Sequence, residues 1–294
     1  MSPVPAGRGF RRILCPVDFS RHSRAALRYA SALAERSGGD LTVLTVNDPM
    51  LAAAAAAAIR DVWRLDDETR TELRRFVYRA LGPLGAKATL DVAKGDPAEQ
   101  IDKAARQLGA DLVVVGTHGL SGPRKWFFGS TTESLFRVSA VPVLAVPATA
   151  HGLARDQRRF PGTTWLAPIE LEGTNRAEIR RVTDMADRLG TSLLFLHVVK
   201  PTQAPPWLAG KVGVVDRERF ASAQAGMRRL VGRSRSRVEV GDPVQQIEKA
   251  ARREKAAVIV MTLKRHGLRG PRRGSIAYRV VCSGVAAVLA LPSR

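Results

Sequence analysis

A glycine-rich segment between an apolar run and a helical pattern holds the residues of this chain best suited to chemistry. The run Leu112–Val115 ends at Gly116, and Gly119 and the triplet Gly129-Ser130-Thr131 follow in VVVGTHGLSGPRKWFFGSTTESLF. Glycine lets a ligand approach the backbone closely. The first turn of a helix adds unpaired N–H groups and the positive end of a dipole. The segment therefore predicts a cradle for phosphate or a nucleotide between a strand and a helix.

The same residues also allow a purely structural interpretation. Ser130 and Glu133 have the spacing of a capping box, so we expect Ser130 to cap the helix with or without a ligand. A glycine-rich surface turn followed by an ordinary capped helix would leave this pattern. Both interpretations stay open at this point.

Asp18 places a carboxylate directly after another predicted strand, in the segment CPVDFS. In an open parallel sheet, ligands bind beyond the carboxyl ends of the strands, where the strand order reverses. A carboxylate there can accept hydrogen bonds from ribose hydroxyls or from an adenine amino group. Aspartate is also a favoured helix N-cap, and that role is the alternative.

The spacing G-x2-G-x9-G-[S/T] of the glycine-rich segment resembles the nucleotide loop of the universal stress protein family. The resemblance implies an α/β fold of two tandem Rossmann-like domains (adenine-nucleotide alpha hydrolase type). Each would be a five-stranded parallel sheet of order 3-2-1-4-5 with helices on both faces. The resemblance also implies that ATP binds, with or without Mg²⁺. The positions that it assigns to ATP are Asp18, Val46, Val115, Gly116, Gly119, Gly129, Ser130 and Thr131.

The chain contains an internal repeat. GDPAEQIDKAARQLGADLVVVGTHG is similar to GDPVQQIEKAARREKAAVIVMTLKRHG, and ILCPVDFS is similar to WLAPIELE. A tandem duplication explains these matches, which occur in one order. We expect a first domain at 1–148, a linker at 149–162 and a second domain at 163–294, packed through their final strands as an internal pseudo-dimer. Further association into a homodimer is left open.

Short apolar runs alternate with amphipathic segments, as in a parallel sheet covered by helices. Strands are expected near 11–17, 41–47, 87–92, 111–116 and 142–147, and again near 163–169, 192–199, 236–240, 256–262 and 286–291. Helices are expected near 20–36, 51–81, 97–108 and 130–139, and again near 174–189, 214–232, 243–254 and 275–283. In the repeated Gly-Asp-Pro motifs, Asp96 and Asp242 fit helix N-caps better than phosphate ligands.

The second copy of the glycine-rich segment departs from the first. Glu170 replaces Asp18, and Met261 is expected at the position of Gly116. Three additional residues, 263–265, precede the second His-Gly pair. Of the glycine-rich pattern, only the final Gly-Ser is retained. We therefore expect the second domain to bind ATP weakly or not at all.

The composition limits the class of protein. The chain has 47 Lys and Arg residues against 27 acidic ones, and residues 151–294 hold 27 of the basic and 12 of the acidic residues. This surplus favours anionic partners. Nucleic acid is the less favoured of these, because aromatic residues make up only 5% and no nucleic-acid motif occurs. Two cysteines are too few for a secreted disulfide scaffold. The absence of a signal peptide and of a membrane-length apolar run predicts a cytoplasmic protein.

No catalytic constellation is evident in the sequence. The five histidines lack metal-ligand spacing, and no lysine follows the glycines as in a P-loop. The leading hypothesis is an ATP-binding regulatory or sensor protein of stress adaptation, whose nucleotide state an unidentified protein partner reads. The alternatives are a scaffold without ATP, a polyanion-binding stress protein, and a slow ATPase, autophosphorylating or nucleotidyl-transfer enzyme.

Overall fold

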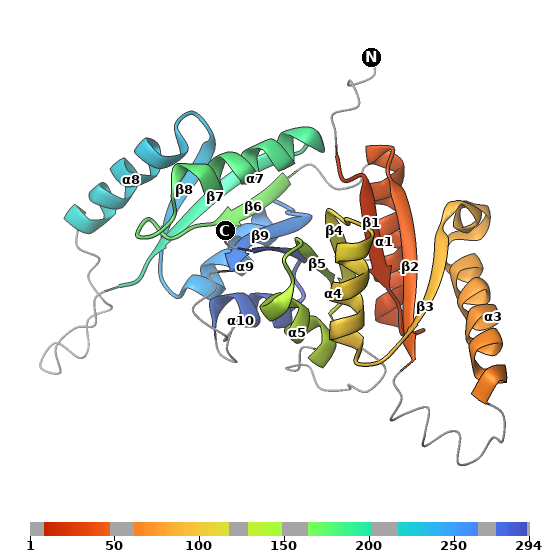
Figure 1. Cartoon of the computed structure of the whole chain (residues 1–294). Coiled ribbons are helices and arrows are strands. Elements are labelled where there is room, and N and C mark those ends of the chain that lie inside the picture. The colour runs from red at the N-terminus through yellow and green to blue at the C-terminus, as the bar shows by residue number, and fades with distance from the viewer. Residues whose placement is uncertain are drawn as a thin grey trace, which may run out of the picture.

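The computed structural model describes residues 9–47, 62–117, 129–148, 164–201, 217–263 and 275–292 (Figure 1). In the first half the strands are β1 (Arg12–Pro16), β2 (Asp40–Asn47), β3 (Thr89–Lys94), β4 (Leu112–Gly116) and β5 (Val143–Val146). The helices there are α1 (Arg21–Ser37), α3 (Val62–Leu81), the 3-10 helix η1 (Gly82–Lys87), α4 (Pro97–Gln107) and α5 (Ser130–Val138).

The second half repeats this order. Its strands are β6 (Thr164–Pro168), β7 (Ser192–Val199), β8 (Arg235–Val240), β9 (Val258–Leu263) and β10 (Ala287–Pro292). Its helices are α7 (Arg176–Arg188), α8 (Arg217–Val231), α9 (Pro243–Arg253) and α10 (Ile276–Ser283). Nearly all of these elements lie where the sequence predicts them.

The two halves share one ten-stranded sheet of order β3-β2-β1-β4-β5-β10-β9-β6-β7-β8. All strand pairs within a half are parallel, so each half has the expected order 3-2-1-4-5. The halves meet where β5 and β10 pair antiparallel, with Leu144 opposite Leu289. The expectation that they join through their final strands as a pseudo-dimer agrees with this pairing.

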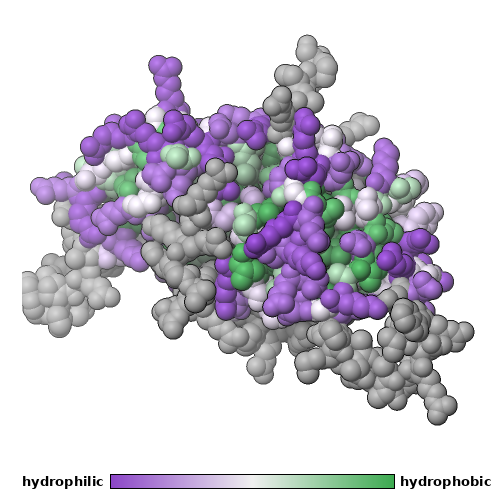
Figure 2. Space-filling model, viewed as in Figure 1, coloured by the Kyte–Doolittle hydropathy of each residue, from purple (hydrophilic) through white to green (hydrophobic). Residues whose placement is uncertain are grey.

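The strands are apolar because both faces of the sheet are covered. One apolar layer packs under α1, α3, α7 and α8, and the other under α4, α5, α9 and α10, and both layers run through the two halves. Four residues of β4 are buried, as expected of a parallel strand with helices on both sides. Polar residues cover most of the described surface in the view of Figure 2, and hydrophobic ones show between the helices.

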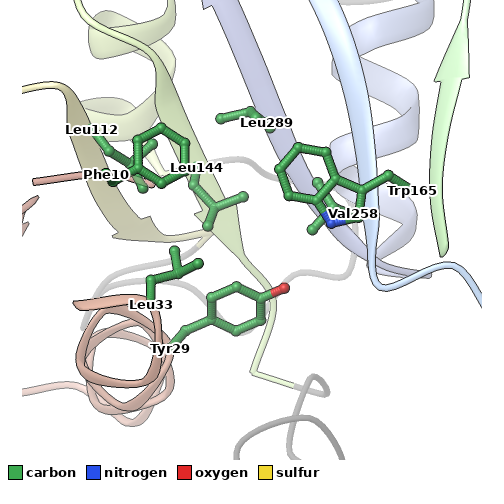
Figure 3. Close-up of a pocket in the computed structure, with 8 residues that line it drawn as sticks. All are labelled: Phe10, Tyr29, Leu33, Leu112, Leu144, Trp165, Val258 and Leu289. Atoms are coloured by element: carbon green, nitrogen blue, oxygen red, sulfur yellow. The ribbon is translucent and has the colours of Figure 1, made fainter. Parts of the chain in front are cut away.

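The junction of the halves is closely packed. Arg36 Nε in α1 donates to the Leu189 carbonyl oxygen at the end of α7, at 3.1 Å. At the same junction lies a cavity of about 10 Å³, lined by side chains from both halves (Figure 3). These lining residues are Phe10, Tyr29, Leu33, Leu112, Leu144, Trp165, Val258 and Leu289. The space is too small for any ligand larger than a water molecule.

The Gly-Asp-Pro motifs are helix starts, as predicted. Asp96 and Asp242 are N-caps whose Oδ1 atoms each accept the N–H three residues further on, at 3.0 Å. Gly95 and Gly241 precede them with φ of 136° and 138°, a region that disfavours side chains. The motif therefore serves the backbone, and its aspartates are already engaged in capping.

One connection differs from the sequence expectation. The 3-10 helix Gly82–Lys87 follows α3, and β3 begins only at Thr89. Gly82 has φ 60°, which ends α3, and a proline stands at the start of the 3-10 turn. The alanine run at 52–58, expected in the preceding helix, lies outside the described residues. Among the described residues, no helix combines the length and apolarity that a membrane span requires.

Candidate functional site

The switch point of the first half lies between β1 and β4, which are neighbours in the sheet although far apart in sequence. Ile13 pairs with Leu112 and Leu14 with Val113. The chain leaves β1 toward one face of the sheet through α1, and it reaches β4 from α4 on the other face. The carboxyl ends of the two strands therefore flank a crevice of the kind in which such sheets bind ligands.

Asp18 follows β1 at this crevice and is partly exposed. Its Oδ1 accepts the Ser20 N–H at 3.1 Å, and its own N–H donates to Ser23 Oγ at 3.4 Å. The N-cap of α1 is Ser20, whose side chain accepts the Ser23 N–H at 3.1 Å. The alternative that Asp18 caps the helix is therefore wrong. Its Oδ2 accepts no hydrogen bond from the described residues.

Gly116 ends β4 against the first turn of α1. A Cβ at this position would lie 2.8 Å from the carbonyl carbon of His22 and 3.0 Å from its oxygen. Thr132 Oγ1, in α5, donates to the Gly116 carbonyl oxygen at 2.9 Å. The glycine is thus required by the protein's own packing, which the sequence did not reveal. The contact brings the start of α1, the end of β4 and α5 together.

The start of α5 differs from the capping-box prediction. Its N-cap is Gly129, with no side-chain cap, and Ser130 is the exposed first helical residue. The helix begins there because the Gly129 N–H donates to the Thr117 carbonyl oxygen at 3.0 Å, which fixes the turn. Glu133 pairs with Arg137 one turn further along. The prediction that Ser130 caps the helix is therefore wrong, and no side chain of the described residues caps the first-turn N–H groups.

The other predicted site residues lie around this point or outside the described residues. Val115 is a buried residue of β4, and Thr131 is a half-buried residue in the first turn of α5. Val46 is near the end of β2, where it pairs with Ala93 of β3, and β2 is the neighbour of β1. Gly119 lies outside the described residues.

The register of the second half corrects one prediction. Trp165 pairs with Val258 as Ile13 pairs with Leu112. Counting along β9 from this pair puts Met261 at the position of Val115 and Thr262 at the position of Gly116. The expectation that Met261 replaces the glycine is wrong, because strand pairing sets the equivalence. Two residues, rather than three, are therefore added before the second His-Gly pair.

The crevice of the second half is engaged by its own side chains. Ser275 is the N-cap of α10, and its Oγ accepts the Tyr278 N–H at 3.2 Å. His197 Nδ1, in β7, donates to the carbonyl oxygen of Ile169, just after β6, at 3.0 Å. Glu170, the counterpart of Asp18, is exposed. This half therefore lacks the uncapped helix start of the first half.

The remaining titratable groups near the crevice give no separate site. Among the described residues, no three His, Cys, Asp or Glu side chains are grouped as metal ligands. Cys15 lies within β1 and is fully buried, and this burial raises the pKa of its thiol far above the ordinary value. It is therefore a core residue, in which the thiol acts as a small apolar side chain.

The fold, the repeat and the glycine-rich crevice together define a class, a tandem pair of Rossmann-like domains. The chain belongs to the universal stress protein family, whose sequence model matches residues 9–147 and 166–292. The proposed domain limits, 1–148 and 163–294 around a linker at 149–162, stay a prediction, since the whole linker lies outside the described residues.

Known relatives agree with this membership. A universal stress protein of Mycolicibacterium smegmatis is 26% identical over 302 residues, covering 96% of this chain and 97% of the relative. The universal stress protein YxiE of Bacillus subtilis is 30% identical over 146 residues, 47% of this chain and 99% of its own length. A crystal structure of a universal stress protein from Archaeoglobus fulgidus has a TM-score of 0.63 at 18% identity, covering 96% of this chain and 98% of its own. That last likeness shows the fold.

Proposed function

We propose that this chain is an ATP-binding universal stress protein with a regulatory role in stress adaptation, and that it binds one nucleotide, in its first half. The observation that carries the proposal is the start of α5, which no side chain of the described residues caps, together with the carboxylate of Asp18 at the switch point between β1 and β4. The second half has the same fold without this combination.

The charges of the crevice orient the ligand. The first-turn N–H groups of α5, at Ser130 and Thr131, and the helix dipole favour phosphate. The carboxylate of Asp18 repels phosphate but accepts hydrogen bonds from ribose or adenine. The nucleoside is therefore assigned to the Asp18 end and the triphosphate to Gly129, Ser130 and Thr131.

The remaining assignments come from the family resemblance. They place the backbone of Val46 and Val115 at adenine and that of Gly116 and Gly119 along the ribose and phosphates. Mg²⁺, where it accompanies the nucleotide, would be held mainly by phosphate oxygens and water. The carboxylate of Asp18 is not assigned to the metal, because it lies at the nucleoside end of the ligand, away from the phosphates.

Calorimetric titration of the full chain with ATP, ADP and AMP tests the proposal, with and without Mg²⁺. We expect one site per chain, and tighter binding of ATP than of AMP because α5 contacts the outer phosphates. Hydrolysis measured in the same samples separates a slow ATPase from a binding protein. The absence of saturable binding, or two equal sites, would contradict the proposal.

Two matched substitutions locate the site. Asp18→Asn keeps the oxygen that accepts the Ser20 N–H but removes the charge. It should weaken ATP binding about 10-fold or more, because hydrogen bonds to charged groups contribute about 1.5–3 kcal/mol. Glu170→Gln makes the equivalent change in the second half and should leave the affinity unaltered. The reverse result would move the nucleotide to the second half.

A further inference from the structure

Phe19, directly after Asp18, has an unusual backbone conformation. Among the described residues, only Phe19 and Lys255 combine a side chain with a positive φ, at 62° and 50°. Lys255 follows the end of α9, where helices commonly terminate in this conformation. Phe19 lies between β1 and α1, and a bulky residue holds such a conformation only where its surroundings enforce it.

Contacts on both sides of Phe19 supply that constraint. Its ring packs edge-to-face against the ring of Phe76 in α3, with centroids 5.5 Å apart and planes at 85°. The Arg24 guanidinium, from α1, lies 5.5 Å from the centroid of Phe76. Phe76 is 4% exposed, so this anchor belongs to the core. On the backbone side, the bond from Ser20 N–H to Asp18 Oδ1 closes the turn around Phe19.

The second half shows the same connection without the strain. Leu171 occupies the place of Phe19 and packs near α8, where a Cβ on Gly226 would lie 3.2 Å from Leu171 Cδ1. The positive φ there belongs to Gly173, at 96°, which tolerates it. The connection is also longer, because β6 ends at Pro168 and α7 begins at Arg176, whereas Pro16 and Arg21 bound the first. The strained short turn therefore occurs in the half that carries the proposed site.

We infer that Phe19 is a positioning residue for Asp18, and that the contact between Phe19 and Phe76 couples the nucleoside end of the crevice to helix α3. This inference rests on the proposed function. The fixed turn sets the direction of the Asp18 carboxylate, so a shift of α3 that releases the Phe19 ring also releases the carboxylate. Because coupling is reciprocal, a nucleotide held by Asp18 stabilises the packing of α3. Nucleotide binding therefore changes the stability of α3, which lies beside β3 at the outer edge of the sheet.

The test is a double-mutant cycle on ATP affinity, measured by calorimetry. Phe76→Leu keeps most of the buried volume but removes the ring that anchors Phe19. We expect it to weaken ATP binding about 5- to 10-fold in the native background, and less than about twofold in an Asp18→Asn background, since contacting residues couple and independent ones add. Phe19→Leu, which copies the second half, should behave in the same way.

A control in the same helix separates coupling from general destabilisation. Val77 faces η1, since a Cβ on Gly85 would lie 2.8 Å from Val77 Cγ1. Val77→Ala should lower the melting temperature and leave ATP affinity unchanged. Equal losses for Phe76→Leu in both backgrounds, or the same loss with Val77→Ala, would overturn the inference. If the native protein binds ATP and the Phe76→Leu variant binds it equally well, the inference is also overturned. If the native protein binds no ATP, the proposed function is overturned instead.

Discussion

The substitution Gly116→Ala tests the packing at the centre of the crevice. The added Cβ would meet two backbone atoms of His22, at 2.8 and 3.0 Å. To restore an ordinary contact of about 3.4 Å, the first turn of α1 must move away from β4 by about 0.6 Å. That helix is anchored by buried residues such as Leu27 and Tyr29, so the movement strains the core. Overpacking of this kind costs about 1–3 kcal/mol.

Two quantities should change together. The melting temperature should fall by about 2–12 °C, since 1 kcal/mol corresponds to about 2–4 °C in proteins of 150–250 residues. ATP affinity should fall at least about 10-fold, because a shift of about 0.6 Å at the start of α1 also moves Ser20, whose N–H holds the Asp18 carboxylate, and binding sites tolerate only about 0.5 Å. Thermal unfolding followed by circular dichroism and calorimetric titration measure the two effects.

Gly226→Ala is the matched control. Its Cβ would meet the flexible Leu171 side chain at 3.2 Å, and it lies in α8, where alanine has the higher helix propensity. We expect stability to be unchanged or higher and ATP affinity to be unaltered. Gly116→Ala with an unchanged melting temperature would refute the packing argument. A loss of ATP affinity alone would mean that the glycine is needed for the approach of the ligand.

Three further predictions concern single elements. Ser275→Ala removes the cap of α10 and should cost about 1 kcal/mol in unfolding experiments, whereas Ser130→Ala should spare stability and weaken ATP binding. Burial raises the pKa of the Cys15 thiol, so this thiol stays protonated at pH 8. Iodoacetamide should therefore alkylate the half-buried Cys282 of native protein well before Cys15, as mass spectrometry can show. Trp165 Nε1 is buried without a hydrogen-bond partner among the described residues, so Trp165→Phe should cost less than about 1 kcal/mol, far below the 3–5 kcal/mol typical of Trp→Ala.

Local signals explain why most elements could be predicted from the sequence. Buried parallel strands such as β4 are continuous apolar runs, and Asp96 caps α4 through a hydrogen bond to a residue only three positions further along the chain. The start of α5 could not be predicted in this way. It depends on the hydrogen bond between Gly129 and Thr117, which are separated by a loop. The capping-box spacing does not contain this contact, so it predicted Ser130 as the N-cap in place of Gly129.

The equivalence of the two halves at β4 and β9 has the same origin. Residue types alone favour matching Thr117 with Thr262, which leaves Met261 opposite Gly116. The pairing of Val258 with Trp165 shifts this match by one residue, because hydrogen bonding across the sheet fixes the register. Similarly, no pattern in the sequence reveals that the Gly116 position is closed by the His22 backbone. Such contacts join segments distant along the chain.

The departures from local rules gather at one place in the first half. A phenylalanine has a positive φ after Asp18, α5 begins without a side-chain cap, and Gly116 lies against the backbone of His22. Each departure is absent from the second half, where Gly173 takes the positive φ, Ser275 caps α10 and Thr262 replaces the glycine. Both halves descend from one repeat and share one sheet, so the repeated fold can form without these three features, although in the first half the packing of α1 against β4 requires Gly116. Locally unfavourable features persist where a site needs them, and a copy released from ligand binding is free to accept the more stable alternatives. The asymmetry therefore supports the proposal that the nucleotide binds in the first half, whereas the second half supplies β10 as the partner strand for β5.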